Sequence, residues 1–211
     1  MTRITPEQIR EAARVHHLES ALIHALIDVE SGGSGFFSDG SVKILFERHI
    51  LWNRLQTPGR EINPSRLARA HPEWCGPRWD PKQYPYGPIL GQWPKVFSII
   101  TWAQQNDPEE WESYKKAALE SCSYGLFQLL GYHYERTGFP SVYEFKHAME
   151  ESEARQMEIA LLWMQKNGLL ARLQHKDWPR FVQGYNGPAN VAVYTEKLKS
   201  AYEKWSKEPG T

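Results

Sequence analysis

The sequence predicts a mostly helical α+β protein with one small β-hairpin near the start of the chain. Apolar residues recur at helical spacing along most of its length, and helix-start signals recur from Thr5 onward. One Asp39-Gly40 turn signal separates two short apolar runs, which is typical of a hairpin. With 211 residues, the chain is long enough to bury a sizeable core, and we expect a single domain over residues 1–211.

Two helices are expected before the hairpin. The first begins after Thr5, which caps it, with Pro6 at the first helical position and Gln8 completing a capping box. The second covers residues 20–30, and its apolar residues share one broad face with Glu30. Three glycines follow within five residues, so we expect room for a ligand and a turn into the hairpin.

Strand alternation in the hairpin predicts that Val42, Ile44 and Phe46 lie on one face. Glu47 ends the returning strand on the other face. Because a hairpin brings its two ends together, we expect Glu30 and Glu47 to face each other.

Residues 57–94 differ in composition from the rest of the chain, since eight of the fourteen prolines lie there together with several tryptophans. Proline withholds a backbone donor, so we expect an irregular insertion with one short helix near residues 63–71. Its aromatic residues are expected to cover the core, and some of them to contact a ligand. From residue 94 the pattern predicts helices at 94–106, 108–121, 124–131, 141–149, 152–167, 169–175, 178–184 and 191–206.

Composition excludes several classes of function. Lys plus Arg equals Asp plus Glu, at 25 each, so there is no basic surface for nucleic acid or for a membrane. No apolar run reaches the roughly 20 residues of a membrane span, and the polar start of the chain has no signal core. Cys75 and Cys122 have no disulfide or zinc spacing, and no histidine motif predicts a metal. We therefore expect a soluble protein without metal or cofactor.

The two glutamates suit the two roles of glycoside hydrolysis, in which one carboxyl group stays protonated and another stays ionised. Glu30 ends an apolar face, and both burial and a helix C-terminus raise a carboxyl pKa. Glu47 is expected in a wetter setting that leaves its pKa low. The simpler alternatives are a solvated helix end for Glu30 and a helix-dipole contact for Glu47.

Three stretches resemble signatures of the lysozyme superfamily, which includes goose-type lysozymes and lytic transglycosylases. They are Glu30-Ser31, the segment SYGLFQ at residues 123–128, and YNG at residues 185–187. The ordered series VESGGSGF, ILFERH, ALESCSYGLFQLLG, SVYEF and DWPRFVQGYNGP is more closely similar to the N-acetylmuramidase domain of bacteriophage endolysins. This resemblance runs from about residue 21 to residue 205.

The resemblance implies a lysozyme-like fold and a muramidase catalytic domain that cleaves the β-1,4 bond between N-acetylmuramic acid and N-acetylglucosamine. Glu30 would be the general acid. Glu47 would stabilise the oxocarbenium-like transition state, act as the nucleophile or activate a water, and the outcome would be retention or inversion. The predicted substrate-binding residues are Ser31, Ser123, Tyr124, Gln128, Tyr185 and Asn186.

Each of these binding residues has a simpler alternative. Ser123 is expected to cap a helix, and Asn186 before a glycine also suits an ordinary turn. Tyr185 would hydrogen-bond the acid or stack on a sugar ring. Glu120 precedes a serine as Glu30 does, but it follows a charged helix and no hairpin comes after it, so we expect a structural role for it.

By the same resemblance, the partner is bacterial peptidoglycan, and the protein is expected to be a monomer without a separate wall-binding module. An endolysin waits in the host cytoplasm and reaches the periplasm and cell wall once a holin opens the membrane. Two alternatives stay open. The first is a lytic transglycosylase that forms 1,6-anhydro-muramic ends, and the second is a non-catalytic wall-binding phage protein.

Overall fold

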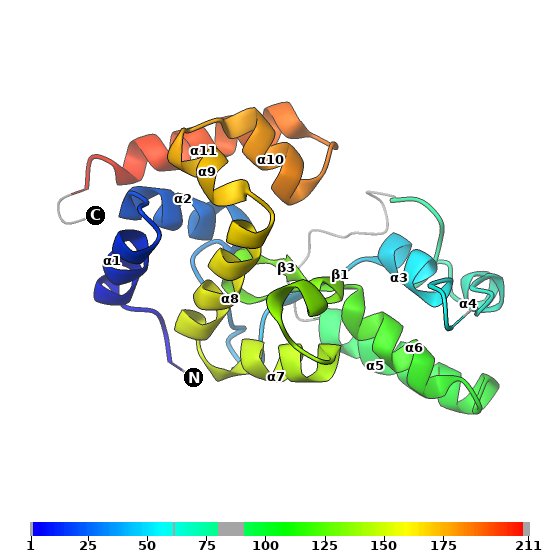
Figure 1. Ribbon diagram of the computed structural model, residues 1–211. Helices are drawn as coiled ribbons and strands as arrows, with labels where there is room; N and C mark the ends of the chain where they lie inside the picture. The colour runs from blue at the N-terminus through cyan, green and yellow to red at the C-terminus, as the bar shows by residue number, and fades with distance from the viewer. Residues whose placement is uncertain (1, 61, 80–90, 209–211) are drawn as a thin grey trace. The chain divides into compact units, whose positions relative to one another are not determined.

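Helix α1 (Pro6–Val15) begins where the capping box predicts. In the computed structural model, which describes residues 2–60, 62–79 and 91–208, the Gln8 backbone N–H donates to the Thr5 hydroxyl. The Thr5 N–H donates in return to the Gln8 side chain. The described chain is mostly helical with one small sheet, which confirms the expected fold class (Figure 1).

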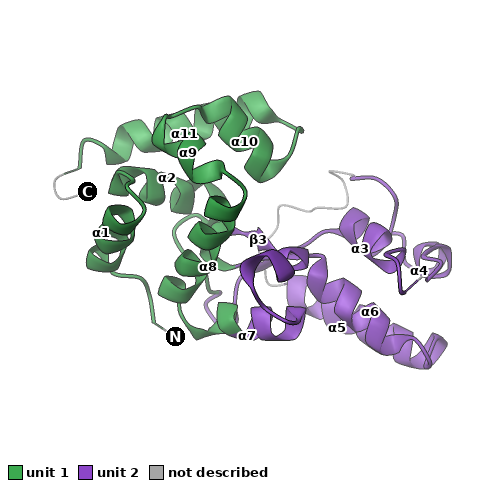
Figure 2. Cartoon of the chain, in the orientation of Figure 1, with its two compact units in different colours: residues 1–36, 125–127, 148–211 green, residues 37–124, 128–147 purple. Residues whose placement is uncertain are grey.

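The chain divides into two compact units, and each is assembled from segments that are far apart in the sequence (Figure 2). Unit 1 contains Met1–Phe36, Gly125–Phe127 and Ala148–Thr211. Unit 2 contains Phe37–Tyr124 and Gln128–His147. Glu30 therefore belongs to unit 1 and Glu47 to unit 2, and each is described within its own unit.

In unit 1, helix α2 (Ser20–Ser31) packs against α1, against α11 (Val191–Trp205) and against the 3-10 turn η3 (Gly125–Phe127). Leu22, Ile23 and Leu26 of α2 are buried, as its apolar face predicts. Helix α8 (Glu153–Lys166) packs on η3 and on α9 (Leu169–Gln174), and α10 (Trp178–Asn186) packs on α9 and α11. The end of α2 that carries Glu30 is thus held by segments from the middle and the end of the chain.

Unit 2 is built around helices α5 (Gln92–Asn106) and α6 (Trp111–Glu120), which pack on each other. Helix α3 (Arg48–Leu55) packs on α6, and α4 (Ser65–Ala70) is the short helix expected near residues 63–71. The remaining elements are the 3-10 turns η4 (Gly131–His133) and η5 (Glu135–Thr137) and helix α7 (Val142–Glu151), whose last residues belong to unit 1. Tyr84 and Tyr86 lie outside the described residues.

The sheet of unit 2 differs from the expected hairpin. Its strands are β1 (Ile44–Phe46), β2 (Cys122–Tyr124) and β3 (Leu129–Leu130), in the order β1-β2-β3 and all antiparallel. The predicted turn forms, since the Ser41 N–H donates to the Asp39 side chain at 2.9 Å. Strand β1, however, pairs with β2, and Ile44 lies opposite Tyr124. The expected alternation is confirmed, because Val42, Ile44 and Phe46 are all buried. The strand that pairs with β1, however, comes from much later in the chain.

The helix expected at residues 124–131 is wrong. The segment is a strand, a 3-10 turn and a second strand, with left-handed backbone at Gly125 (φ 69°) and Gln128 (φ 46°). A short apolar run that is buried on all sides does not distinguish a helix from a strand. The other helices after residue 94 lie close to their predicted positions.

Candidate active site

Glu30 lies in the last turn of α2, where the helix ends on Gly32 in the left-handed conformation (φ 65°). Its carboxyl group is partly buried, and the Asn186 side-chain N–H donates to Glu30 Oε1 at 3.1 Å. Burial raises the pKa of Glu30 to about 7, although the Asn186 hydrogen bond and the Lys197 charge act in the opposite direction. The expected raised pKa is confirmed, and a large fraction of Glu30 carries a proton at neutral pH.

Tyr185 precedes Asn186 at the end of α10 and anchors this helix end to η3. Its hydroxyl donates to the Phe127 carbonyl at 2.6 Å. Its ring stacks on Phe181 at 5.3 Å and meets the edge of Trp163 at 5.6 Å. The hydroxyl and the ring are thus used by the protein itself, so Tyr185 supports the Asn186 backbone and does not donate to the acid.

Ser31 and the glycines complete the end of α2. The Ser31 hydroxyl is buried and donates to the Ile27 carbonyl at 3.0 Å, which closes the last helical turn. Gly32 and Gly33 both have positive φ, and an added Cβ at either would have no atom within 4 Å, as the expected clearance requires. Gly35 differs, because an added Cβ would collide with the Gln156 side chain.

Glu47 lies between β1 and α3 in unit 2, and its backbone N–H donates to the Ser121 carbonyl at 2.9 Å. Its side chain is 20% exposed and makes no capping hydrogen bond to α3. Burial raises the pKa of Glu47 to about 7, against a hydrogen bond with Ser123 that lowers it. The expected wet setting with a low pKa is therefore wrong. His49 Nε2 lies 3.6 Å from the Glu47 carboxylate.

Of the residues predicted near SYGLFQ, Ser123 forms a hydrogen bond with Glu47, a proposed catalytic residue. Ser123 lies in β2, so its predicted role as a helix cap is wrong. Tyr124 has no exposed surface, and its hydroxyl donates to the Leu119 carbonyl at 2.9 Å. Tyr124 thus belongs to the core of unit 2 and offers nothing to a substrate. Gln128 is half-buried, and its left-handed backbone is strained for a residue with a side chain.

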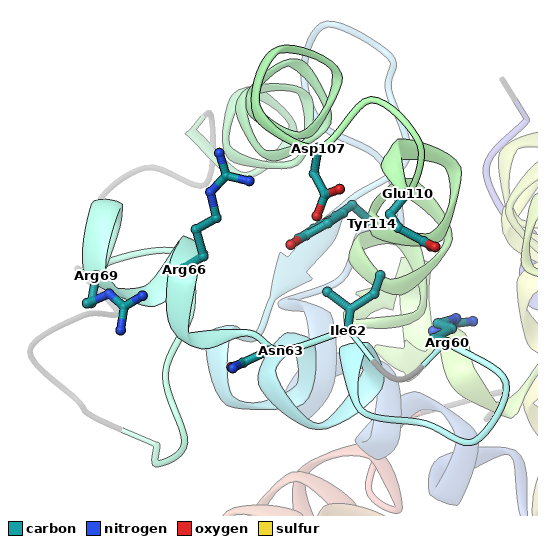
Figure 3. Close-up of a pocket in the computed structure, with 8 residues that line it drawn as sticks. All are labelled: Arg60, Ile62, Asn63, Arg66, Arg69, Asp107, Glu110 and Tyr114. Carbon is teal, nitrogen blue, oxygen red and sulfur yellow. The ribbon is translucent and has the colours of Figure 1, made fainter.

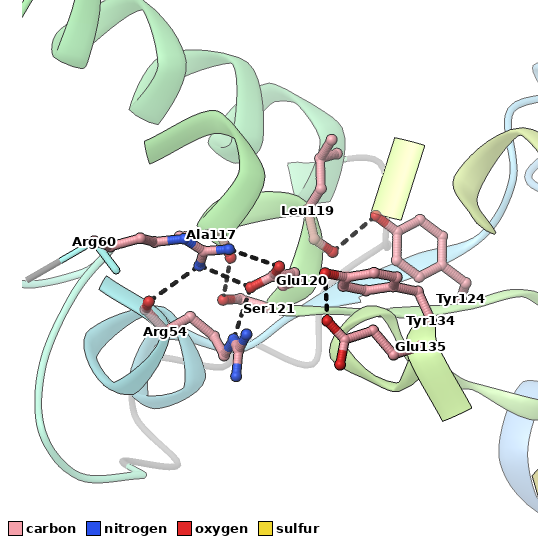
Figure 4. Close-up of polar contacts among 9 residues, drawn as sticks. All are labelled: Arg54, Arg60, Ala117, Leu119, Glu120, Ser121, Tyr124, Tyr134 and Glu135. Atoms are coloured by element: carbon pink, nitrogen blue, oxygen red, sulfur yellow. Dashed lines mark hydrogen bonds and ion pairs between the residues drawn. The ribbon is translucent and has the colours of Figure 1, made fainter. Parts of the chain in front are cut away.

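Glu120 is structural, as expected. It is fully buried and accepts a two-pronged hydrogen bond from Arg60 at 2.7 and 2.8 Å and a further bond from Arg54 Nε at 2.7 Å (Figure 4). Although burial alone would raise its pKa, Arg60 and Arg54 lower the pKa of Glu120. A carboxyl group held ionised by two guanidinium groups is unsuited to donate a proton.

Two hollows in the described part of the chain are not lined by Glu30 or Glu47. One, of about 280 Å³, lies in unit 2 and has basic and acidic walls (Figure 3). The other, of about 560 Å³, lies between α1 and α8 in unit 1 and has an apolar floor. The residues of the first hollow are Arg60, Ile62, Asn63, Arg66, Arg69, Asp107, Glu110 and Tyr114.

The described residues contain no cluster of three or more metal-ligating side chains. Within the described ranges, there is also no helix with the length and apolar character needed to cross a bilayer. Sequence reasoning missed Lys197, whose charge acts on Glu30 from α11. A lysine on an exposed helix face carries no local signal of such a role, because the contact depends on how α11 packs on α2.

Unit 1 thus brings together the predicted residues Glu30, Asn186 and Tyr185, and unit 2 brings together Glu47 and Ser123. The expectation that the two acids face each other stays a prediction.

Comparisons with known proteins identify the family of the chain. The family model described as N-acetylmuramidase matches residues 19–206 of the chain. Among solved structures, the chain is similar to the crystal structure of the Burkholderia AP3 phage endolysin, with 31% sequence identity and a TM-score of 0.75. That match covers 98% of this chain and 73% of the other. No curated protein sequence matches.

Proposed function

The chain belongs to the N-acetylmuramidase family, and on that premise we propose that it is a phage endolysin with Glu30 as its general acid. It hydrolyses the β-1,4 bond between N-acetylmuramic acid and N-acetylglucosamine in bacterial peptidoglycan. The observation that carries the proposal is the Glu30 carboxyl group, which burial keeps partly protonated at neutral pH and which Asn186 holds from one side.

The contact with Asn186 suggests which oxygen carries the proton. An amide N–H donates to an oxygen with a free lone pair, so Asn186 favours Oε1 as the carbonyl oxygen of the protonated acid. The proton then lies on Oε2, from which it passes to the glycosidic oxygen as the C1–O bond breaks. Asn186 is therefore proposed to orient the acid, and substrate contact is secondary for it.

Glu47 is proposed as the second carboxyl group of the reaction. With a pKa of about 7 it is only partly ionised at neutral pH, and the hydrogen bond from Ser123 favours the ionised form. Its three candidate roles are distinguished by azide rescue of Glu47→Ala. A glycosyl azide product shows that the missing group was a nucleophile or a base. The anomeric configuration of the wild-type product then separates the two, because a nucleophile gives retention and a base gives inversion. No rescue supports electrostatic stabilisation.

Gln128 is proposed to contact the sugar through its side-chain amide, which offers both a donor and acceptors to an N-acetyl group. The strained backbone at this position supports the proposal, because such strain is concentrated at binding sites.

The raised pKa of Glu47 also favours a second candidate function. If Glu47 is largely protonated when substrate is bound, Glu30 must act alone, first as acid and then as base. The sugar's own hydroxyl would then close a 1,6-anhydro ring, as in a lytic transglycosylase.

Mass spectrometry of the muropeptides released from purified peptidoglycan tests both functions. The hydrolase produces reducing N-acetylmuramic ends, and the transglycosylase produces 1,6-anhydro ends. Glu30→Gln should lower the rate by roughly 10²–10⁴-fold. Glu196→Gln is the matched control, because Glu196 is exposed on α11. If the wild-type protein binds peptidoglycan but releases nothing, a wall-binding role replaces the enzymatic one.

The lysis route follows from the endolysin proposal. The protein is proposed to act as a monomer and to reach the wall from the host cytoplasm only after a holin opens the membrane. Expression in the bacterial cytoplasm should leave cells intact until a membrane-permeabilising agent is added. Lysis without that agent would contradict dependence on a holin, and light scattering after size exclusion measures the oligomeric state.

A further inference from the structure

Two polar residues on α8 are almost completely buried in unit 1, although the proposed chemistry does not use them. Glu153 is 2% exposed and Gln156 is 1% exposed, and they lie one helical turn apart. Burying a carboxyl group and an amide is costly unless both form hydrogen bonds. The partners of these hydrogen bonds therefore indicate the role of Glu153 and Gln156.

Glu153 holds the loop that follows Glu30. Its Oε1 accepts from the Gly35 N–H at 2.8 Å and lies 3.4 Å from the Ser34 hydroxyl. Its Oε2 accepts from the Ile4 N–H at 3.0 Å, so the same carboxyl group ties down the start of the chain. The loop at residues 32–35 is thereby fixed at its far end, while its near end is the terminus of α2.

Gln156 holds η3. Its Oε1 accepts from the Leu126 N–H at 2.7 Å, and its Nε2 donates to the Met149 carbonyl at 2.7 Å. Gly35 and Gly125 lie directly against its side chain, and an added Cβ at Gly125 would come within 2.5 Å of it. Both glycines are therefore small because the Gln156 amide occupies the space beside them.

The two sets of contacts converge on Glu30. From η3, the Phe127 carbonyl accepts from the Tyr185 hydroxyl, and the next residue, Asn186, donates to Glu30. From the loop, Gly35 is connected through four residues to Glu30 itself. Glu153 supports one side of the acid and Gln156 the other.

We propose that Glu153 and Gln156 are positioning residues for Glu30, acting through the 32–35 loop and through η3. The inference rests on the proposed role of Glu30 as general acid. If the Glu153 support is lost, the loop beside the acid loosens and admits water, which lowers the penalty on the charged form of Glu30. If the Gln156 support is lost, η3 holds Tyr185 and Asn186 less firmly, and the hydrogen bond that lowers the pKa of Glu30 weakens. In both cases the proton donor is misplaced.

The test uses Glu153→Gln and Gln156→Met in the full chain, since each keeps the side-chain volume and removes hydrogen-bonding capacity. On soluble glycan strands, kcat should fall by roughly ten- to a hundredfold with little change in KM. The alkaline limb of kcat/KM, which reports the free enzyme, should move to lower pH in Glu153→Gln and to higher pH in Gln156→Met. Glu158→Gln and Gln165→Met, at exposed positions of the same helix, should leave both unchanged.

A purely structural role predicts a different result. Variants that melt at lower temperature but keep the wild-type kcat and pH profile when folded would overturn the proposal. Glu30→Gln in the same assay separates the two ideas. If it is inactive while the α8 variants behave as wild type, only the positioning role fails; if it is fully active, the acid assignment fails.

Two further measurements apply if the α8 variants do not fold. Hydrogen exchange on the wild-type protein should show strong protection of the Gly35 and Leu126 amides, and rapid exchange of either would overturn the proposal. Tyr185→Phe interrupts the η3 route and leaves the residues of α8 unchanged. It weakens the support of Asn186, whose hydrogen bond lowers the pKa of Glu30, so it should move the alkaline limb to higher pH. An unchanged limb in that variant contradicts the route through η3.

Discussion

Asn186 donates a hydrogen bond from its side chain to Glu30 at 3.1 Å, and so links the end of α10 to the end of α2. The two residues come from opposite ends of the chain and meet because α10 and α2 both pack on α11. The contact places a neutral donor on a carboxyl group that burial would otherwise keep protonated to higher pH.

Asn186→Ala should therefore raise the pKa of Glu30 further, because it removes a hydrogen bond that favours the charged form. The alkaline limb of kcat/KM should move to higher pH, as expected for Gln156→Met and opposite to the shift expected for Glu153→Gln. The maximal rate should fall about tenfold, because the acid loses its orientation. Gln183→Ala, exposed on the same helix, is the control, and a limb that moves to lower pH would contradict the role of Asn186.

Glu30→Gln should stabilise the protein at alkaline pH. The folded pKa of Glu30 is about 7 and its ordinary value is 4.5, so folding favours the protonated form. That contribution is fully present below pH 4.5 and is lost as the pH rises through 7. The amide imitates the protonated acid, so the variant should exceed wild type by about 3 kcal/mol at pH 8.5 and match it at pH 4. Urea unfolding measures the difference, and a less stable variant at pH 8.5 would contradict the burial account.

Ser123→Ala should raise the pKa of Glu47 above its value of about 7, because the Ser123 hydrogen bond is the contact that lowers it. The measurement is a ¹³C NMR titration of the glutamate carboxyl carbons, assigned with Glu47→Gln. Ser113→Ala on α6 is the matched control. If Glu47 titrates near 4.5 in the wild-type protein, its carboxyl group is solvated, and the low pKa expected from the sequence is correct.

Glu120→Gln should be strongly destabilising, because it leaves the Arg60 guanidinium buried without its counter-charge. We expect a loss of about 3 kcal/mol at pH 7 by urea unfolding, with Glu109→Gln, at an exposed position, within about 0.5 kcal/mol of wild type. The folded pKa of Glu120 is lowered, so its contribution is present above its ordinary pKa and is lost as the pH falls through the folded value. The difference between variant and wild type should therefore shrink in acid, and a constant difference would contradict this ion pair as its source.

Much of the helical fold was predictable because its signals are local. The Thr5 capping box sets the start of α1, and the apolar face of α2 predicts that Glu30 lies at the end of a buried helix. The left-handed glycines after it were also readable, since they end a helix and start a turn.

The errors have a common cause. Alternation places the side chains around β1 on the correct faces, but strand pairing depends on contacts between distant segments. No strand is predicted at β2, and β3 falls within a predicted helix. The setting of Glu47 was misjudged for the same reason, because its burial and its contact with Ser123 arise only once β1 and β2 are paired.

The sequence by itself determined where most of the helices lie, which faces are apolar, and that Glu30 lies at the end of an apolar helical face, because periodicity and capping act within a few residues. Only the tertiary structure decided what surrounds that acid. Asn186, Gly35 and Gln156 reach their positions through packing between segments far apart in the chain. Burial and hydrogen bonding set the pKa of a carboxyl group, and both are properties of the assembled fold.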